Sequence, residues 1–510
     1  MPDLILISRT PFECRVALLE AGEVSEIFIE RRKEKSIVGN IYKGRVIRVL
    51  PGMQSAFVEV GLERTAFLYI QEVSPKELSF SHFADSDEFE IEAFEAKERK
   101  KPASEKIQHL LREGQEILVQ IIREPIDEKG AQLTTHLTLP GRYLVYMPFS
   151  AHLGVSRKIE DEDERSRLKN LLKRIKPEGA GGFIIRTVAK GADSEVIEGE
   201  MFYLLNLWQE IEERAKTSPA PSLVYEEPSL ELRIIREYMA SDTKQIIVDD
   251  EEAHQRLKGY LKRIAPEKEH LLRLWQNQDA LFDHFGVELE LDRALERKVW
   301  LKSGGFIVID ETEALTTIDV NTGKFIGKKS FEDTVLKTNL EASKEIVSQL
   351  RLRNIGGIII IDFIDMHKAK NRQKVLSALK EELKKDKAKT VVVGISDIGL
   401  TEMTRRRTEP SLVKKLCEPC PYCEGKGYLK SPRTVCYEIF YELTKNRSEL
   451  AGRSIKLYVN SMVAELLLGE EKEILDLLLK MYDMKIDVEI RDNFHQEQYE
   501  YSIEGEEKEE

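Results

Sequence analysis

The stretch GGIIIIDFIDM, residues 356–366, decides the fold of the region around it. Four consecutive isoleucines predict a strand that is buried on both faces and that ends at Asp362. Further elements are predicted on either side of it: strands 306–310, 314–320 and 390–395, and helices 333–353 and 371–385. We therefore expect an α/β unit over residues 290–400, in which helix 371–385 and its flanking strands form a βαβ unit.

A second acidic strand precedes the isoleucine strand. In LTTIDVN, residues 315–321, the side-chain period of two puts Asp319 and Asn321 on one face. Ligands of parallel α/β sheets bind beyond the carboxyl ends of the strands, where Asp362 stands. Two neighbouring carboxylates repel each other unless a cation bridges them, and oxygen ligands suit Mg²⁺. Taken singly, each aspartate is better explained as a turn cap, and from spacing alone Asp319, Asn321, Asp362 and Asp365 together shift that balance only modestly.

Residues 37–125 have the pattern of a small OB-type barrel. Short strands with glycine-containing turns are predicted at 39–49, 56–61, 65–68 and 116–122, with a charged insertion at 73–106. Basic and aromatic side chains on such a barrel stack on single-stranded RNA. The candidate RNA-contacting residues of the barrel are Tyr42, Lys43, Phe57, Phe67 and Arg123. A core position is an equally good interpretation of Phe57 and Phe67, and the mixed charges of the insertion favour a solvated loop or helix.

Three of the five cysteines lie between Cys417 and Cys423. The motif CPYCEGKG, residues 420–427, is half of a zinc knuckle, since two thiolates are separated by two residues and glycines allow the turn. A structural zinc needs four ligands. Cys417 could supply a third, or two chains could each contribute Cys420 and Cys423. The motif could also be a redox pair, but we see no thioredoxin-like context and favour zinc.

The composition is that of an ordinary globular protein. Of 510 residues, 41% are hydrophobic and 33% are charged, and this length predicts three or four domains. No run approaches the ~20 apolar residues of a membrane span, and no signal peptide is recognisable, so we expect a cytoplasmic protein. The net charge of -13 implies that any RNA contact comes from local basic patches.

Several long motifs resemble those of the ribonuclease E/G family: NIYKGRV at 40–46, LPGMQ at 50–54, IDVNTG at 318–323, LRLRNIGG at 350–357 and IDFIDM at 361–366. The resemblance implies a multidomain α/β architecture with an OB-type barrel inserted near the N-terminus. Its expected domains are a ribonuclease-H-like subdomain (1–36 and 231–293), an S-one-type RNA-binding barrel (37–125), a 5′-end sensor domain (126–230), a DNase-I-like catalytic domain (294–416), a zinc link (417–429) and a small C-terminal domain with an acidic tail (430–510).

The resemblance also implies roles for individual residues. Asp319 and Asp362 match the Mg²⁺ ligands, and Asn321 matches the catalytic residue that positions the scissile phosphate or the water, whereas Asp365 could be structural. Arg186 and Thr187 match a pocket for a 5′-monophosphate. Lys389 stands where the family carries a second arginine of that pocket, so we expect altered discrimination of the 5′ end, because lysine lacks the planar guanidinium fork.

The implied activity is Mg²⁺-dependent cleavage of single-stranded, A/U-rich RNA in rRNA maturation and mRNA decay. It prefers 5′-monophosphate ends and leaves a 5′-phosphate and a 3′-hydroxyl. The resemblance further implies a homodimer that shares Zn²⁺ through Cys420 and Cys423, with a tetramer left open. The layout is that of the G-type members, so we expect no long scaffold region and no membrane anchor. The alternatives are a non-catalytic RNA-binding protein and a phosphodiesterase that acts on DNA or small nucleotides.

Overall fold

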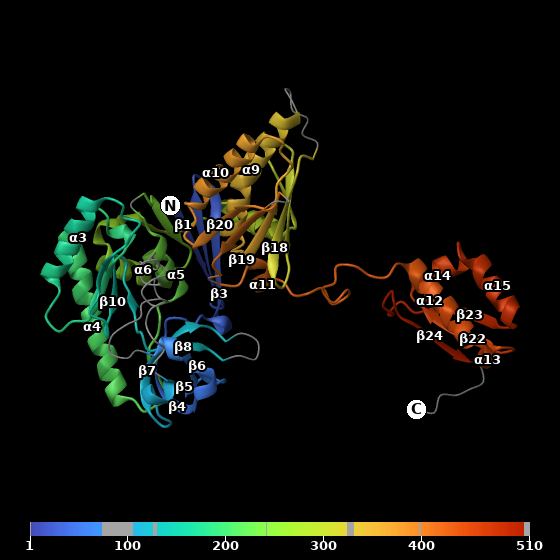
Figure 1. Cartoon of the computed structure of the whole chain (residues 1–510), viewed down its shortest axis with the longest axis horizontal. Coiled ribbons are helices and arrows are strands. Elements are labelled where there is room, and N and C mark those ends of the chain that lie inside the picture. The colour runs from blue at the N-terminus through green and yellow to red at the C-terminus, as the bar shows by residue number, and fades with distance from the viewer. Residues whose placement is uncertain are drawn as a thin grey trace. The chain divides into compact units, whose positions relative to one another are not determined.

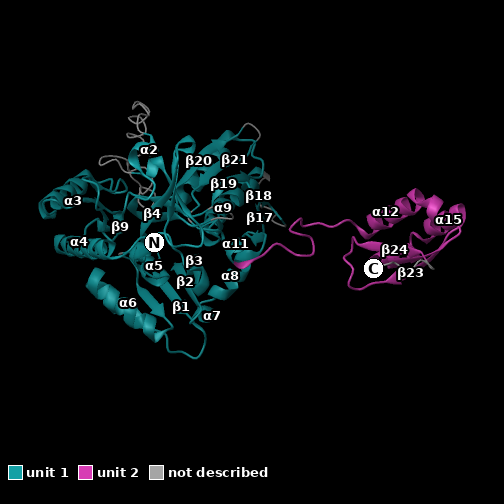
Figure 2. Cartoon of the chain, turned by 90° about the horizontal axis from the view of Figure 1, so that it is seen from below, with its two compact units in different colours: residues 1–415 teal, residues 416–510 magenta. Residues whose placement is uncertain are grey.

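A computed structural model describes residues 2–73, 106–125, 130–240, 242–323, 331–396, 399–407 and 409–503. The predicted insertion at 73–106, apart from its two end residues, and the acidic tail at 504–510 lie outside these residues. The chain forms two compact units, residues 1–415 and 416–510 (Figure 2). Both units mix helices and strands (Figure 1). Among the described helices, none combines the length and the apolar character that crossing a membrane requires.

A closed five-stranded barrel lies near the N-terminus, consistent with the expected OB-type fold. Its strands pair in the order β4–β5–β6–β8–β7 and close through β4 and β7: β4 (Ile41–Leu50), β5 (Ser55–Glu59), β6 (Ala66–Tyr69), β7 (Glu116–Arg123) and β8 (Gln132–Thr134). A Cβ atom on Gly44 would lie 2.7 Å from Val58 Cγ1, so glycine allows β4 to pack this closely on β5. The barrel extends past the expected limit at residue 125, because β8 pairs with both β6 and β7.

The first residues of the chain form a separate five-stranded sheet with residues 245–274. Its order is β15–β14–β1–β2–β3, in which β1, β2 and β3 are antiparallel and β14 and β15 run parallel to β1. The elements are β1 (Leu4–Arg9), β2 (Glu13–Glu20), β3 (Glu23–Arg31), β14 (Gln245–Val248), β15 (Leu272–Leu274), and helices α5 (Leu230–Tyr238) and α6 (Glu251–Ile264). The apolar faces of both helices pack on this sheet. Its assignment as a ribonuclease-H-like subdomain stays a prediction.

A four-stranded sheet with two helices occupies residues 139–217. Its strands are β9 (Leu139–Pro140), β10 (Leu144–Met147), β11 (Leu153–Val155) and β12 (Gly182–Ile185), and its helices are α3 (Glu162–Ile175) and α4 (Ser194–Thr217). Helix α3 begins after Asp161, whose side chain accepts hydrogen bonds from the N–H groups of Asp163 and Glu164. Strand β13 (Ser222–Tyr225) then returns to pair with β4 of the barrel.

Six strands form the sheet that carries the acidic residues, in the order β16–β17–β18–β19–β21–β20. They are β16 (Lys298–Trp300), β17 (Phe306–Glu311), β18 (Leu315–Asn321), β19 (Gly357–Asp362), β20 (Thr390–Ile395) and β21 (Thr401–Arg405). Helices α9 (Phe331–Leu352) and α10 (Ala369–Leu383) share one apolar core with this sheet (Figure 1). Strands β18 and β19 are parallel neighbours joined through α9.

Strand β21 lies between β19 and β20 and is antiparallel to both, so β19 and β20 are parallel and α10 joins them as a βαβ unit across one intervening strand. The expectation that the isoleucine strand is buried on both faces is wrong. Strand β19 is buried on one face only, because Ile359 and Ile361 have no exposed surface whereas Ile358 is 50% exposed. The helices contribute core residues to one face of the sheet, and the side chains of the other face reach solvent. Residues 401–405 alternate in burial, but two of the three buried positions are the polar Thr401 and Arg405, so the sequence lacks the apolar alternation that would have predicted β21.

In the second unit, a small α/β domain follows the cysteine motif in the sequence. Its sheet has the order β23–β22–β24, with β22 (Ser454–Val459), β23 (Lys485–Ile490) and β24 (Tyr499–Ile503). Its helices are α12 (Pro432–Lys445), α13 (Arg447–Leu450), α14 (Ser461–Leu468) and α15 (Lys472–Tyr482), and they pack on the sheet around their own apolar core.

Candidate active site

Asp319 and Asp362 are direct partners in the register of the parallel strands β18 and β19. Both side chains lie on the exposed face of the sheet, while the alternating residues of each strand point into the core. The third predicted residue joins them, since Asn321 Nδ2 donates a hydrogen bond of 2.8 Å to Asp319 Oδ2. The structure therefore brings the three predicted catalytic residues together in one solvent-accessible cluster.

The electrostatics of this cluster favour a bound cation. The pKa of Asp362 is raised by partial burial and by the negative charges of Asp319 and Asp365. A divalent ion between the two strands would remove this repulsion. Among the described residues, no group of three or more His, Cys, Asp or Glu side chains is arranged to hold a metal ion. Two carboxylates nevertheless fit Mg²⁺, which binds through few protein ligands and keeps most of its positions for water and phosphate oxygens.

Asn339 holds the loop that follows β19. This residue has no exposed surface on helix α9, and its Nδ2 donates to the carbonyl of Ile364 at 2.8 Å. Its Oδ1 accepts from the N–H of Ile364 at 3.1 Å. Both bonds fix the backbone between Asp362 and Asp365. The sequence analysis missed Asn339, although an amide on the buried face of a predicted helix is a recognisable signal, because a buried amide needs partners.

The two residues of the predicted 5′-phosphate pocket follow β12. Arg186 is 6% exposed, and its guanidinium donates to the carbonyl of Gly141 at 2.7 Å and forms an ion pair with Glu237. The hydroxyls of Thr187 and Ser156 lie 2.8 Å apart. Burial alone would raise the pKa of Glu237, but Arg186 and Arg236 outweigh it and hold this pKa at about 2. Arg186 thus already has a carboxylate partner, which an incoming phosphate would share.

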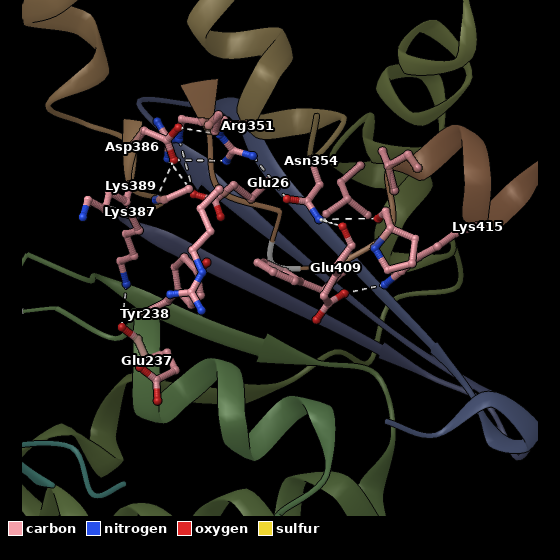
Figure 3. Close-up of a pocket in the computed structure, with 17 residues that line it drawn as sticks. Glu26, Glu237, Tyr238, Arg351, Asn354, Asp386, Lys387, Lys389, Glu409 and Lys415 are labelled. Atoms are coloured by element: carbon pink, nitrogen blue, oxygen red, sulfur yellow. Dashed lines mark hydrogen bonds and ion pairs between the residues drawn. The ribbon is translucent and has the colours of Figure 1, made fainter. Parts of the chain in front are cut away.

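Lys389 lines a neighbouring cavity of about 220 Å³, together with Glu237, Tyr238 and Lys387 (Figure 3). The Lys387 ammonium donates to the Glu237 carbonyl at 2.6 Å and lies 3.6 Å from the centre of the Tyr238 ring. Lys387 therefore contacts the helix that carries Glu237, a role that the sequence analysis did not assign. The only signal in the sequence is its position two residues before Lys389.

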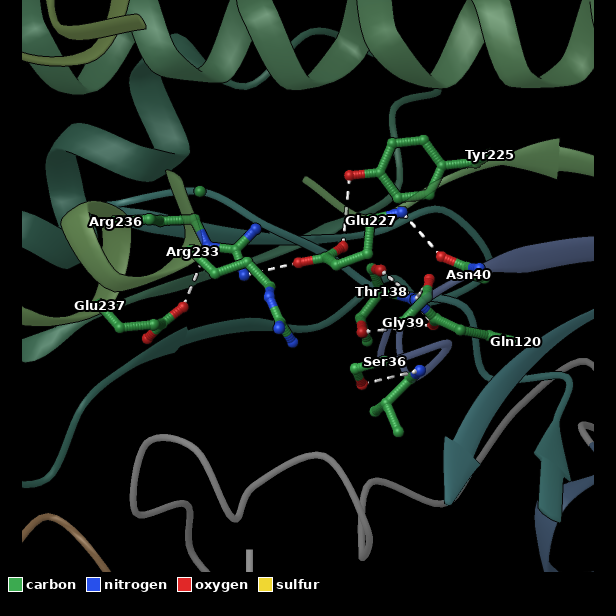
Figure 4. Close-up of polar contacts among 12 residues, drawn as sticks. Ser36, Gly39, Asn40, Gln120, Thr138, Tyr225, Glu227, Arg233, Arg236 and Glu237 are labelled. Carbon is green, nitrogen blue, oxygen red and sulfur yellow. Dashed lines mark hydrogen bonds and ion pairs between the residues drawn. The ribbon is translucent and has the colours of Figure 1, made fainter. Parts of the chain in front are cut away.

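A buried polar network connects this region to the barrel (Figure 4). The Arg236 guanidinium donates to Glu227 at 2.6 Å and to Glu237 at 3.0 Å. The N–H of Glu227 in turn donates to Asn40 Oδ1 at 2.8 Å, directly before β4. Because Glu237 also pairs with Arg186, the phosphate-pocket arginine and the start of the barrel belong to one network.

The predicted barrel residues divide into two groups. Phe57 is 38% exposed and lies opposite Phe67 on β6, and the ring of Phe67 contacts that of Tyr69 at 5.1 Å. These three rings form an aromatic patch, and the period-two spacing from Phe67 could have identified Tyr69. Tyr42, in contrast, is buried in the barrel core, so its ring is not available for stacking.

The two basic residues of the barrel also differ in position. The Lys43 ammonium is engaged by the carbonyl of Ser218 at 3.0 Å and by Glu116 at 3.1 Å. Arg123 is exposed at the end of β7, opposite Gln132. Lys43 and Tyr42 therefore do not belong to the aromatic patch formed by Phe57, Phe67 and Tyr69.

The cysteine motif forms a series of tight turns at the start of the second unit. The N–H of Gly427 points to Cys423 Sγ at 3.4 Å, and backbone N–H groups of Cys423 and Tyr422 lower the pKa of Cys420. Amide groups directed at sulfur favour the thiolate, which is the form that binds zinc. Cys420 and Cys423 thus fit half of a zinc site. Cys417 is exposed and is not in a disulfide.

Comparisons with known proteins match nearly the whole chain. The model of the "Ribonuclease E/G family" matches residues 138–408, and that of the "RNase E/G, Thioredoxin-like domain" matches residues 419–505. Ribonuclease G of Haemophilus influenzae is 43% identical over 500 residues, 98% of this chain and 99% of that protein. Ribonuclease G of Escherichia coli K12 is 42% identical over 495 residues, 97% of this chain and 98% of that protein. Ribonuclease E of the same strain is 34% identical over 475 residues, 92% of this chain but 43% of that protein.

The second match corrects one argument of the sequence analysis, which set aside a redox role for the cysteines because it saw no thioredoxin-like context. The location of the two cysteines still argues against a redox pair. Cys420 and Cys423 lie in turns that precede α12, which begins at Pro432. They are therefore not at the N-terminus of a helix, where the helix dipole would stabilise a reactive thiolate. The motifs, the barrel and the long matches lead to one conclusion: this chain belongs to the ribonuclease E/G family.

Proposed function

We propose that this protein is an endoribonuclease that hydrolyses single-stranded RNA with Mg²⁺ held by Asp319 and Asp362. Its enzyme class, a hydrolase acting on RNA, is that of its family. The observation that carries the proposed site is the register between β18 and β19, which sets the two carboxylates side by side on an exposed face with Asn321 beside them. A long RNA strand can reach this face, whereas a purely structural aspartate pair would gain nothing from such exposure.

The chemistry follows from this arrangement. A Mg²⁺ ion bound at Asp319 and Asp362 would polarise the phosphate and lower the pKa of bound water. The Asn321 amide holds Asp319 in one orientation through its hydrogen bond and presents its remaining polar atoms to the scissile phosphate or the water. Water attacks phosphorus in line and forms the new P–O bond while the bond to the 3′-oxygen breaks. The 3′-oxygen takes up a proton, which yields a 3′-hydroxyl and a 5′-phosphate.

Substrate recognition is assigned to two regions away from the carboxylates. The exposed ring of Phe57 and the half-buried ring of Phe67 can stack on bases of a single strand, because every base offers a π-face. Arg186 and Thr187, with Lys389 nearby, would bind a 5′-monophosphate. This assignment predicts a preference for unpaired RNA that carries a 5′-monophosphate, and the resemblance to the family adds the proposed preference for A/U-rich RNA.

The assembly proposal rests on the cysteine motif. Two chains that each contribute Cys420 and Cys423 would supply the four thiolates of a tetrahedral Zn²⁺ site and form a homodimer, with a tetramer as a further step. A role in rRNA maturation and mRNA decay in the cytoplasm agrees with this activity. The exposed carboxylate pair favours this function over the alternative of an RNA-binding protein without catalysis.

The test is cleavage of a short 5′-monophosphorylated, A/U-rich RNA with Mg²⁺. The wild type is compared with the double variant Asp319→Asn, Asp362→Asn. Asp310→Asn is the matched control, because Asp310 lies on the same sheet face, opposite Thr317, and pairs with exposed Arg297. We expect cleavage by the wild type and the control, and binding without cleavage by the double variant. Equal cleavage by the double variant would disprove the assigned site, and cleavage of a matched DNA strand would contradict the RNA specificity.

A further inference from the structure

Two aromatic rings and a lysine form a cluster on the first two strands of the catalytic sheet. Trp300 of β16 lies opposite Phe306 of β17, and their ring centres are 5.4 Å apart. The Lys298 ammonium lies 4.0 Å from the centre of the Trp300 ring and 3.6 Å from that of the Phe306 ring. This cluster of Lys298, Trp300 and Phe306 is called the aromatic platform below.

The platform lies on the same face of the sheet as the two catalytic aspartates. Directly opposed residues of neighbouring strands share a face. Phe306 is opposite Asn321, and Val308 beside it is opposite Asp319, which is opposite Asp362. Phe306 and Trp300 therefore continue the row of side chains that begins at Asn321, and Lys298 continues the neighbouring row of Asp362, Asp319 and Val308. With strands ~4.8 Å apart, Phe306 lies one strand from Asn321 and Trp300 lies two strands, about 10 Å, from it, which places the platform about one to two nucleotides from the site.

The glycines of the hairpin set this placement. The turn between β16 and β17 contains Gly304 at φ +98°, which a residue with a side chain rarely adopts. A Cβ atom on Gly305 would lie 2.7 Å from the carbonyl oxygen of Asn321, and one on Gly323 would lie 3.4 Å from the Phe306 ring. The three glycines thus let Phe306 pack directly against the end of β18, where the catalytic amide stands.

The exposure of Trp300 calls for a ligand. Its side chain is 62% exposed, although burial of so large an apolar surface is favourable. Packing within the chain therefore does not account for it. The Lys298 ammonium, which contacts both rings, places a positive charge near Asp319 and Asp362. A phosphodiester backbone that binds there would neutralise the charge of Lys298. Flat aromatic surface with an adjacent cation is the combination that binds single-stranded nucleic acid.

We infer that the aromatic platform binds the base of a nucleotide next to the scissile phosphate, with Trp300 as the stacking residue and Lys298 directed to the neighbouring backbone phosphate. This inference rests on the proposed function and adds a specificity-determining surface to it. Stacking there would hold the strand with one phosphate over Asp319 and Asp362. It would also make cleavage sensitive to the presence of a base at one position beside the cut.

The experiment uses short 5′-monophosphorylated RNAs with one cleavage site, in which a single abasic nucleotide is placed in turn at each position around the cut. In the wild type, one abasic position next to the cut should lower kcat/KM about tenfold. Trp300→Ala should lower kcat/KM on the intact RNA by about the same factor and should lose the sensitivity to that abasic position. Trp300→Phe, which keeps a flat ring, should recover most of the activity. Phe12→Ala is the control, because Phe12 is 70% exposed in the bend between β1 and β2.

A binding measurement separates the platform from catalysis. In the Asp319→Asn background, titration with the intact RNA should quench tryptophan emission, and Trp300→Phe should abolish most of the quenching. The protein has three tryptophans, of which Trp208 is buried, so Trp300 is well suited to report contact. The platform is supported if Trp300→Phe loses the quenching in the Asp319→Asn background and, as a single variant, keeps most of the cleavage activity of the wild type.

Three results would contradict the aromatic platform or the proposed function, and each result shows which of the two fails. Additive effects of Trp300→Ala and the abasic nucleotide would overturn the platform while leaving the proposed function intact. A shift of Trp300→Ala to a smaller species in sedimentation velocity would show that a second copy of the chain covers this face, which also overturns it. Absence of cleavage of every RNA by the wild type would instead contradict the proposed function, and the fluorescence titration would still test the platform.

Discussion

Asp319 and Asp362 are opposite each other in the parallel pair β18–β19, although 43 positions separate them in the chain and only Asp362 ends its strand. Partial burial raises the pKa of Asp362, and the negative charges of Asp319 and Asp365 raise it further, so the isolated pair is repulsive. A site built from like charges is destabilising until a cation binds, so metal binding should be visible as stabilisation.

The first prediction concerns this linkage. Mg²⁺ should raise the unfolding temperature of the wild type. At a Mg²⁺ concentration of a hundred times the dissociation constant, it should add about 2.7 kcal/mol to the free energy of unfolding. Asp319→Asn with Asp362→Asn should remove the Mg²⁺ effect and should leave the metal-free protein as stable as the wild type or more so, because the repulsion is gone. Differential scanning calorimetry with EDTA and with Mg²⁺ measures both. An equal Mg²⁺ shift in the double variant would locate the ion elsewhere.

The second prediction concerns Lys389. Because lysine lacks the planar fork of arginine, Lys389→Arg should increase the ratio of cleavage rates between 5′-monophosphorylated and 5′-hydroxyl RNA several-fold. Arg186→Lys should lower the same ratio toward one. Lys384→Arg is the control, since the side chain of Lys384 is 72% exposed and pairs with Glu381, three residues earlier in the chain. A ratio unaffected by both changes would remove Arg186 and Lys389 from 5′-end recognition.

The third prediction follows from the pKa of Glu237, which lies at about 2 because Arg186 and Arg236 outweigh its burial. A carboxyl with a depressed folded pKa contributes stability that is present above its unfolded pKa of ~4.3 and is lost as the pH falls toward 2. Glu237→Gln should therefore lower the free energy of unfolding by about 2 kcal/mol at pH 7, with some screening because the side chain is 27% exposed. In urea titrations the difference from the wild type should shrink between about pH 5 and pH 3. A pH-independent difference would mean that lost packing causes the effect.

The fourth prediction separates the two groups of barrel residues. Phe57→Ala and Phe67→Ala should each weaken the binding of single-stranded RNA by about 1–3 kcal/mol, as expected for loss of one stacking ring. Tyr42→Phe should leave binding unchanged, because the ring of Tyr42 is buried in the barrel core. Fluorescence anisotropy with a labelled RNA measures all three. Weaker binding by Tyr42→Phe alone would restore Tyr42 to the contact surface.

The fifth prediction concerns the cysteine motif. Cys420→Ser should release zinc, and the dimer should dissociate, because one thiolate from each chain is lost from the shared site. Cys436→Ser is the control, since Cys436 is buried within α12 and lies apart from the motif. Zinc content by atomic absorption and mass by light scattering provide the readouts. If the wild type is instead a monomer that binds zinc, the site is completed within one chain, and Cys417 is the first candidate for a further ligand.

The sequence by itself determined the local elements and the choice of candidate catalytic residues. Strand 390–395 was predicted with the bounds that β20 has, and the predicted helices 333–353 and 371–385 lie within two residues of the bounds of α9 and α10. These features depend on short-range periodicity, which the side-chain pattern encodes directly. Family membership was equally accessible, because motifs such as IDFIDM at 361–366 are local strings.

Only the tertiary structure decided what depends on partners distant in the chain. It inserted β21 between β19 and β20, closed the barrel with β8, and left one face of the isoleucine strand exposed, so that Asp362 and Asp319 reach solvent together. It also buried Arg186 against Glu237 and set Trp300 across from Phe306. Strand order and ion pairing depend on which surfaces bury each other from water. The periodicity of a sequence shows that one face of an element is apolar, but it does not show which other element covers that face.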